Sequence, residues 1–198
     1  WDAEAGAWQA DTSGSIERTR IGRHMLLFEK GRFTCDGEAV LEPPETGHYY
    51  RPYYALGRLF FYHGFREDSD PEKGWTRLHA VPWVPGGGPV DMTATTALEL
   101  GHVMESTFAW GQLDGKVITC GTYNYELCCP PAYFYDLALA RFDTNGQPDS
   151  SFGVDGVATI QILNMRESNH NEVKVLDDGK LLISVNGEGL FNGEFALV

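Results

Sequence analysis

The side chains with the most evident chemistry are three histidines placed near the starts of apolar, strand-like runs. His48 precedes Gly57 by nine residues, His170 precedes Gly179 by nine, and His102 precedes Gly115 by thirteen. Imidazoles gathered at equivalent strand ends can hold a metal ion or an anion. A divalent-metal site at His48, His102 and His170, with Glu172 as an oxygen ligand, is therefore one interpretation. Ordinary polar strand ends are the favoured one, and no cofactor is expected other than a divalent metal ion.

Calcium is a second cation to consider, at Asp143-Thr144-Asn145-Gly146. Carboxylate and amide oxygens are calcium ligands, but this run lacks the glutamate that closes an EF-hand loop. Asp and Asn-Gly also favour tight turns, because the Asp side chain accepts backbone N–H groups and Gly adopts positive φ. We predict a turn here, and a similar cap at Asp149.

Four tyrosines mark a candidate ligand-binding rim. Tyr123, Tyr125, Tyr133 and Tyr135 flank Pro130-Pro131 in a segment, residues 122–135, that we expect to be a long loop. Loops carry binding residues more often than scaffolds do, and tyrosine is enriched at interfaces. Protein or glycan ligands are the partners that such a rim predicts.

No motif of nucleophilic or metalloprotease catalysis is found: G-x-S-x-G and H-E-x-x-H are both lacking. No catalytic residue is predicted. A formal charge of −13 argues against a nucleic-acid partner, because phosphate contacts need a basic face. No apolar run approaches the roughly 20 residues of a membrane-spanning helix.

The four cysteines leave the redox state open. Cys120 can pair with Cys128 or Cys129 in an oxidising compartment, or it can remain a free buried thiol. Neither these residues nor Cys35 form the C-x-x-C pairs that are typical of zinc sites.

The elements that must position these residues repeat along the chain of 198 residues. Residues 56–62, 114–120 and 178–184 share the order glycine, basic residue, apolar strand, and their glycines lie 58 and 64 residues apart. A strand precedes each of these segments, and further strands follow, so each unit has four short strands. The Gly at each turn indicates a tight hairpin, and the sequence shows no helical periodicity.

The two ends of the chain are complementary in this repeat. Residues 11–19 align with residues 143–151, and residues 194–198 align with residues 136–140. We expect units at about 48–101, 102–163 and 164–198, the last completed by residues 1–34 of the same chain or of a partner. The whole chain, 1–198, is then a single repeat domain, either part of a longer propeller or half of a strand-swapped homodimer.

A family resemblance supports this architecture. Residues 137–146 (LALARFDTNG), followed by Asp149, Phe152 and Gly153, and residues 176–183 (LDDGKLLI) resemble the bacterial delta-sixty repeat. The resemblance is specific over residues 113–198 and weaker before them, where residues 82–89 replace the expected turn. It implies a β-propeller-like array in a secreted or cell-surface protein, without shared catalytic residues.

Fold class and function follow from these observations. We predict an all-β, β-propeller-like chain with about three four-stranded blades, one of them split between the termini, since single blades need neighbours to bury their faces. The leading functional prediction is a non-catalytic binding or structural module. The alternative is a metal-dependent hydrolase, or another enzyme, that uses residues at the central channel.

Overall fold

The computed structural model of the chain consists of short antiparallel strands. It describes residues 8–11, 16–29, 31–65, 74–100, 109–127, 132–161, 172–176, 180–185 and 194–197. Within these ranges the helical element is a single 3₁₀ turn, η2 (Met92–Ala94). No helix in the described part is both long and apolar enough to cross a membrane. The chain divides into two compact units, residues 1–101 and 102–198.

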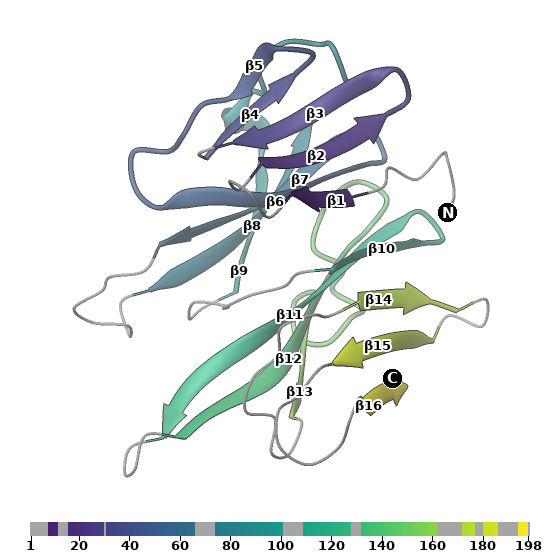
Figure 1. The fold of residues 1–198 in the computed structure, drawn as a ribbon. Helices are drawn as coiled ribbons and strands as arrows, with labels where there is room; N and C mark the ends of the chain where they lie inside the picture. The colour runs from purple at the N-terminus through teal and green to yellow at the C-terminus, as the bar shows by residue number, and fades with distance from the viewer. Residues whose placement is uncertain are drawn as a thin grey trace. The chain divides into compact units, whose positions relative to one another are not determined.

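The first unit contains two sheets, coloured purple to teal in Figure 1. One has five strands in the order β1-β2-β3-β4-β5 and the other has four in the order β6-β7-β8-β9, so both are simple antiparallel meanders. The strands are β1 (Trp8–Asp11), β2 (Ile16–Ile21), β3 (His24–Glu29), β4 (Arg32–Cys35), β5 (Glu38–Leu41), β6 (His48–Ala55), β7 (Arg58–Phe65), β8 (Trp75–Pro82) and β9 (Thr96–Glu99).

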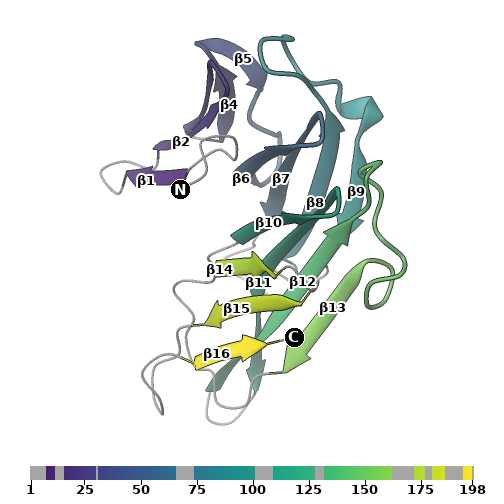
Figure 2. The same cartoon turned by 90° about the vertical axis from the view of Figure 1, so that its right-hand side faces the viewer.

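The second unit repeats this plan, in green and yellow in Figure 2. Its sheets have the orders β10-β11-β12-β13 and β14-β15-β16, and both are again antiparallel meanders. The strands are β10 (Ala109–Leu113), β11 (Lys116–Leu127), β12 (Ala132–Phe142), β13 (Val157–Gln161), β14 (Glu172–Val175), β15 (Leu181–Val185) and β16 (Glu194–Leu197).

The prediction of an all-β, β-propeller-like fold is confirmed. The sheets β6-β7-β8-β9 and β10-β11-β12-β13 fall within the predicted units 48–101 and 102–163. The described strands of residues 8–41 pair with one another in a sheet of their own. The single closed domain, and the completion of residues 164–198 by residues 1–34 of the same chain or of a partner chain, stay predictions.

The hairpin turns form for the reason that the sequence indicates. Asp114 and Gly115 join β10 to β11 with φ values of 52° and 74°, and Leu56 and Gly57 join β6 to β7 with 53° and 68°. Two successive positive φ values are typical of the type I′ turn, whose twist matches that of the strands it connects.

Each unit buries its core between its two sheets. In the first unit, residues of β3, β4 and β5 pack with residues of β6, β7 and β8, and the buried members include Leu26, Phe33, Cys35, Val40, Tyr49, Leu59, Phe61 and Val81. In the second unit, residues of β11 and β12 pack against β15, and the buried members are Ile118, Cys120, Leu137, Leu139, Leu181 and Ile183. Apolar residues two apart on a strand thus supply one buried face per sheet.

Five residues of the repeat signature form one cluster of contacts in the second unit, which we call the Asp149 node: Lys116, Arg141, Asp149, Ser151 and Phe152. Asp149 is 8% exposed and receives Lys116 Nζ at 2.7 Å and Arg141 Nε at 2.8 Å. Its other carboxylate oxygen accepts the Ser151 N–H and hydroxyl, which confirms the predicted cap. The Arg141 guanidinium also lies 4.4 Å from the centre of the Phe152 ring. The signature residues therefore bind one another and tie the turn after β12 to β11.

The turn at Asp143 is likewise structural. Its carboxylate accepts the N–H groups of Asn145 and Gln147, at 2.8 and 2.9 Å, and the Gly146 N–H donates to its carbonyl. These bonds are those of a capped turn, so the turn prediction is confirmed.

Replacing Asp149 with asparagine should lower the free energy of unfolding by about 2 kcal/mol. The lysine and arginine would lose a buried partner, but both are partly exposed, so the cost stays below that of a fully buried pair. Urea unfolding measures the change. Asp155→Asn, at an exposed turn position, is the matched control, and equal effects of the two substitutions would contradict the role of the node.

Candidate metal site

A short hairpin at one end of the five-stranded sheet builds the site. Cys35 ends β4, and the Asp36-Gly37 turn that follows has φ values of 52° and 90°. Asp and Gly tolerate this left-handed conformation better than other residues do. β3 pairs with β4 and starts at His24, so register brings His24 beside the turn.

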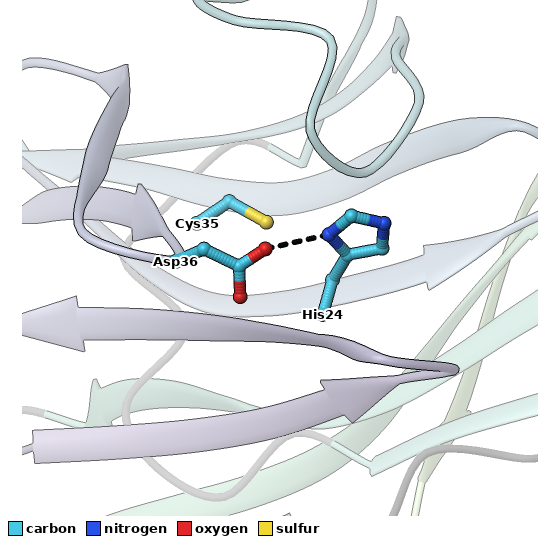
Figure 3. A group of neighbouring side chains, drawn as sticks. All are labelled: His24, Cys35 and Asp36. Atoms are coloured by element: carbon cyan, nitrogen blue, oxygen red, sulfur yellow. Dashed lines mark hydrogen bonds and ion pairs between the residues drawn. The ribbon is translucent and has the colours of Figure 1, made fainter.

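Three potential metal ligands meet there, as Figure 3 shows. His24, Cys35 and Asp36 each offer one donor atom, and these nitrogen, sulfur and oxygen atoms all lie within 4.8 Å of one another. His24 Nδ1 lies 2.6 Å from Asp36 Oδ2, and the other carboxylate oxygen accepts the Met25 N–H at 2.8 Å. The Asp36 carboxylate is thus fixed by the backbone and in turn orients the imidazole.

The hydrogen bonds define how His24 is held without a metal. Arg23 Nε lies 3.4 Å from His24 Nε2, so Nε2 is the acceptor and Nδ1 carries the proton that it donates to Asp36. The Met25 N–H, and then His24, hold the pKa of Asp36 below its usual value. The carboxylate is therefore ionised at neutral pH and supplies a negative charge to the site.

The loop of residues 83–90 forms a wall of the site. Gly86 has a φ of 78°, and a Cβ atom there would lie 3.0 Å from His24 Cε1. The loop is fixed by the Trp83 indole, which donates to the Gly88 carbonyl at 2.9 Å, and by Val90, which donates to the Val40 carbonyl. Glycine at this position permits both the backbone conformation and the close approach to the imidazole.

The Cys35 thiol is the buried member of the cluster, at 3% exposure. Burial raises its pKa, the backbone N–H of Gly86 acts in the opposite direction, and the Asp36 carboxylate adds to the rise. The thiol is consequently protonated at neutral pH. Because a substrate cannot reach it, a nucleophilic role for the sulfur is disfavoured.

The three donors fit a transition metal of zinc type. Zinc binds Cys, His and Asp donors at about 2.0–2.3 Å in a tetrahedral arrangement, so two donors on one ion lie about 3.3–3.8 Å apart. The donors of the cluster lie within 4.8 Å of one another, and a contraction of up to about 1 Å would bring them into this range. The His24 and Asp36 side chains are 21% and 46% exposed, so the fourth position would face water. Three protein ligands with one open position are typical of catalytic zinc sites.

The predicted histidine site remains a prediction. His48 starts β6, is exposed, and lies 5.8 Å from the Tyr50 ring. Glu172 starts β14 and pairs with Ser184, while His102 and His170 lie outside the described residues.

The described parts of the tyrosine segment, residues 122–127 and 132–135, are strands and not a loop. β11 extends to Leu127 and β12 begins at Ala132, so the backbone pairs Tyr123 with Asp136, Asn124 with Tyr135, Tyr125 with Phe134 and Glu126 with Tyr133. Alternation of aromatic and polar residues favours strands, and this signal outweighs the two prolines. Ligand binding by Tyr123, Tyr125, Tyr133 and Tyr135 stays a prediction.

The structure describes two of the four cysteines. Cys35 and Cys120 are free thiols, and burial raises the pKa of Cys120 to about 12. Cys120 is thus a free buried thiol, which was one of the two predicted alternatives. Cys128 and Cys129 lie outside the described residues.

Sequence reasoning missed the cluster of His24, Cys35 and Asp36. The available signal was Asp36-Gly37, a strong hairpin dipeptide flanked by apolar strands, with a cysteine directly before it. The proximity of His24 depended on the register between β3 and β4, which a single sequence does not define.

Comparison with protein families gives one match, over residues 112–152, to a domain of unknown function described as a beta-propeller, DUF5122. The match covers β11, β12 and the Asp149 node. No curated protein matches the chain.

Several similar solved structures are arabinanases. They include the alpha-L-arabinanase of Cellvibrio cellulosa (11% identity, TM-score 0.28, covering 96% of this chain and 91% of that one) and the endo-arabinase of Bacteroides thetaiotaomicron (12%, 0.31, 98% and 93%). A third is an exo-1,5-alpha-L-arabinanase from a bovine ruminal metagenomic library (11%, 0.28, 100% and 94%).

These comparisons contradict the prediction of a non-catalytic binding or structural module. The similar structures are enzymes, and one of them was solved with arabinohexaose bound. At such low identity and TM-score, no substrate and no catalytic residue is transferred to this chain.

Proposed function

We propose that this chain is a metal-dependent hydrolase whose metal ion is held by His24, Cys35 and Asp36. The observation that carries the proposal is the convergence of three donor atoms of different kinds within 4.8 Å at a partly exposed hairpin. A mixed nitrogen, sulfur and oxygen donor set suits zinc or a similar transition metal better than calcium or magnesium, which prefer oxygen ligands.

The surrounding groups support metal binding. The Gly86 N–H favours the thiolate form of Cys35, and the Met25 N–H fixes the Asp36 carboxylate. Outer groups of this kind orient ligands and tune metal affinity. A bound zinc ion would lower the pKa of a bound water molecule to about 7 and so supply hydroxide as a nucleophile at neutral pH.

Two further expectations belong to this proposal. The delta-sixty assignment rests on the signature residues, of which Lys116, Arg141 and Asp149 form a single node. A glycan is a substrate class worth testing, and secretion is expected from the resemblance to exported repeat proteins.

Cobalt titration of the metal-stripped protein tests the site. We expect one equivalent to bind, with the near-ultraviolet charge-transfer band of a cobalt–thiolate bond, because Cys35 must ionise to become a ligand. Cys35→Ala should abolish this band. Cys120→Ala removes a buried thiol of the second unit and should leave it intact. A band that disappears with Cys120 instead would place the metal elsewhere.

Hydrolysis assays with metal-free and zinc-loaded protein test the activity. Suitable substrates are glycans, including arabino-oligosaccharides, together with peptides and carboxylic esters. Turnover that requires zinc and is lost in Cys35→Ala supports the proposal. Cobalt binding without turnover of any substrate class would retain the metal site and overturn the assignment as a hydrolase.

A further inference from the structure

Two histidines that the metal site does not use lie together on the inner face of the four-stranded sheet of the first unit. His63 pairs with Arg77, and Phe61 pairs with His79, so His63 and His79 share a face and their rings lie 5.7 Å apart. His79 is 6% exposed and stacks on Phe61 at 5.0 Å. A titratable ring is thus buried beside the core.

Each of the two rings makes a hydrogen bond through one of its nitrogens. His79 Nδ1 lies 3.3 Å from Thr95 Oγ1, whose hydroxyl donates to the Thr96 carbonyl, so Nδ1 carries the proton. His79 Nε2 is buried and has no hydrogen-bond partner among the described residues. His63 Nε2 donates to the Thr46 carbonyl at 2.8 Å. A second proton on His79 would therefore enter a buried position without an acceptor.

The charges around His79 oppose that proton. Burial lowers the pKa of His79 to about 4, and His63 and Arg77 add to the effect. Arg77 itself is paired with Glu99 on β9. On the β6 side Tyr49 packs against His63, whose own pKa is lowered chiefly by burial.

The same core covers His79 and the metal ligand Cys35. Phe61, which stacks on His79, belongs with Tyr49, Phe33 and Cys35 to one buried cluster between the two sheets. The strands β3, β4 and β5 contribute apolar side chains and the Cys35 thiol to it, with no charged member among its described residues. His79 is thus linked through Phe61 to the packing that shields Cys35.

We propose that acidification opens the layer between the two sheets of the first unit, with His79 as the proton acceptor, and thereby exposes Cys35. Release of the metal ion on acidification would be the consequence, and that consequence rests on the proposed function. The opening itself does not depend on the metal.

The sign of the pH dependence follows from the two states of His79. Its pKa is about 4 in the folded unit against 6.5 when the ring is free, so the open state binds the proton more tightly. Stability is complete above about pH 6.5 and is lost as the pH falls toward 4. The shift corresponds to a change of about 300-fold in the folding equilibrium.

Labelling of Cys35 in the metal-free protein tests the proposal. The probe is 4,4′-dithiodipyridine, which reacts at acidic pH, and peptide mass spectrometry distinguishes Cys35 from the other cysteines. We expect the labelling of Cys35 to rise as the pH falls from 7 to 4.5. In His79→Phe, which keeps an aromatic ring against Phe61, it should remain low. Equal acid-dependent labelling of both proteins would overturn the proposal.

A measurement on the wild type keeps the test decisive if His79→Phe does not fold. An NMR titration should show a His79 ring that stays neutral until the unit opens, with a midpoint well below 6.5. A midpoint near 6.5 with the fold intact would exclude His79 as the acceptor. Because both measurements use metal-free protein, their outcome is independent of whether the metal site exists.

Discussion

Replacing Phe61 with alanine should lower the free energy of unfolding by about 4 kcal/mol. Phe61 is fully buried, and its ring lies 5.5 Å from Phe33, 5.0 Å from Tyr49 and 5.0 Å from His79. It therefore joins strands of both sheets of the first unit. Removal of the ring would leave a cavity that these large neighbours cannot close by small movements.

The matched control is Phe65→Ala on the same strand and the same face. Phe65 is partly exposed and packs chiefly on Trp75, at 6.2 Å, so its loss should cost about 1–2 kcal/mol. Chemical denaturation followed by tryptophan fluorescence measures both. Similar losses for the two variants would show that the core is not centred on Phe61.

Replacing Asp36 with asparagine should weaken cobalt or zinc binding by about 100-fold. Asparagine tolerates the φ of 52° at this position and retains an oxygen to accept the Met25 N–H, so the hairpin should persist. The variant loses the negative charge and the anionic ligand. Competition against a chelator of known affinity measures the change.

Asp91→Asn is the appropriate control for this experiment. Asp91 caps the turn η2 by accepting the Thr93 N–H at 2.9 Å. Its replacement makes the same exchange of carboxylate for amide, but outside the metal cluster. It should leave metal affinity unchanged. If Asp36→Asn binds as tightly as Asp91→Asn, the carboxylate is not a ligand.

Local patterns predicted the strands of the repeat well, because alternating apolar residues and glycine turns act over a few residues. The hairpin turns at Gly57 and Gly115 formed as expected, and so did the caps at Asp143 and Asp149. The ion pairs of Asp149 were not predicted. They join residues 33 and 8 positions apart in the chain, and only strand pairing brings these together.

The site was predicted less well, for the same physical reason. The predicted histidines lie at strand starts, whereas the cluster combines His24 with Cys35 and Asp36 across a hairpin. His63 and His79 were not identified from the sequence, although an imidazole on a buried face is costly unless it stays neutral. Burial and strand register determine which side chains meet in the metal cluster and in the His63–His79 pair. Residue types alone predict neither burial nor register.

The loop of residues 83–90 differs from the equivalent turn of the second unit in the interactions that fix it. It occupies the position where the second unit has its Asp143 turn and Asp149 node, yet it is held by the Trp83 indole and by backbone hydrogen bonds. A turn fixed by ion pairs must keep its charged residues for stability. A turn fixed by an indole and the backbone is released from that requirement, and it places Gly86 against His24 and Cys35. The turn of the first unit can thus lack the charged signature residues without losing its anchor, whereas the turn of the second unit depends on Asp149.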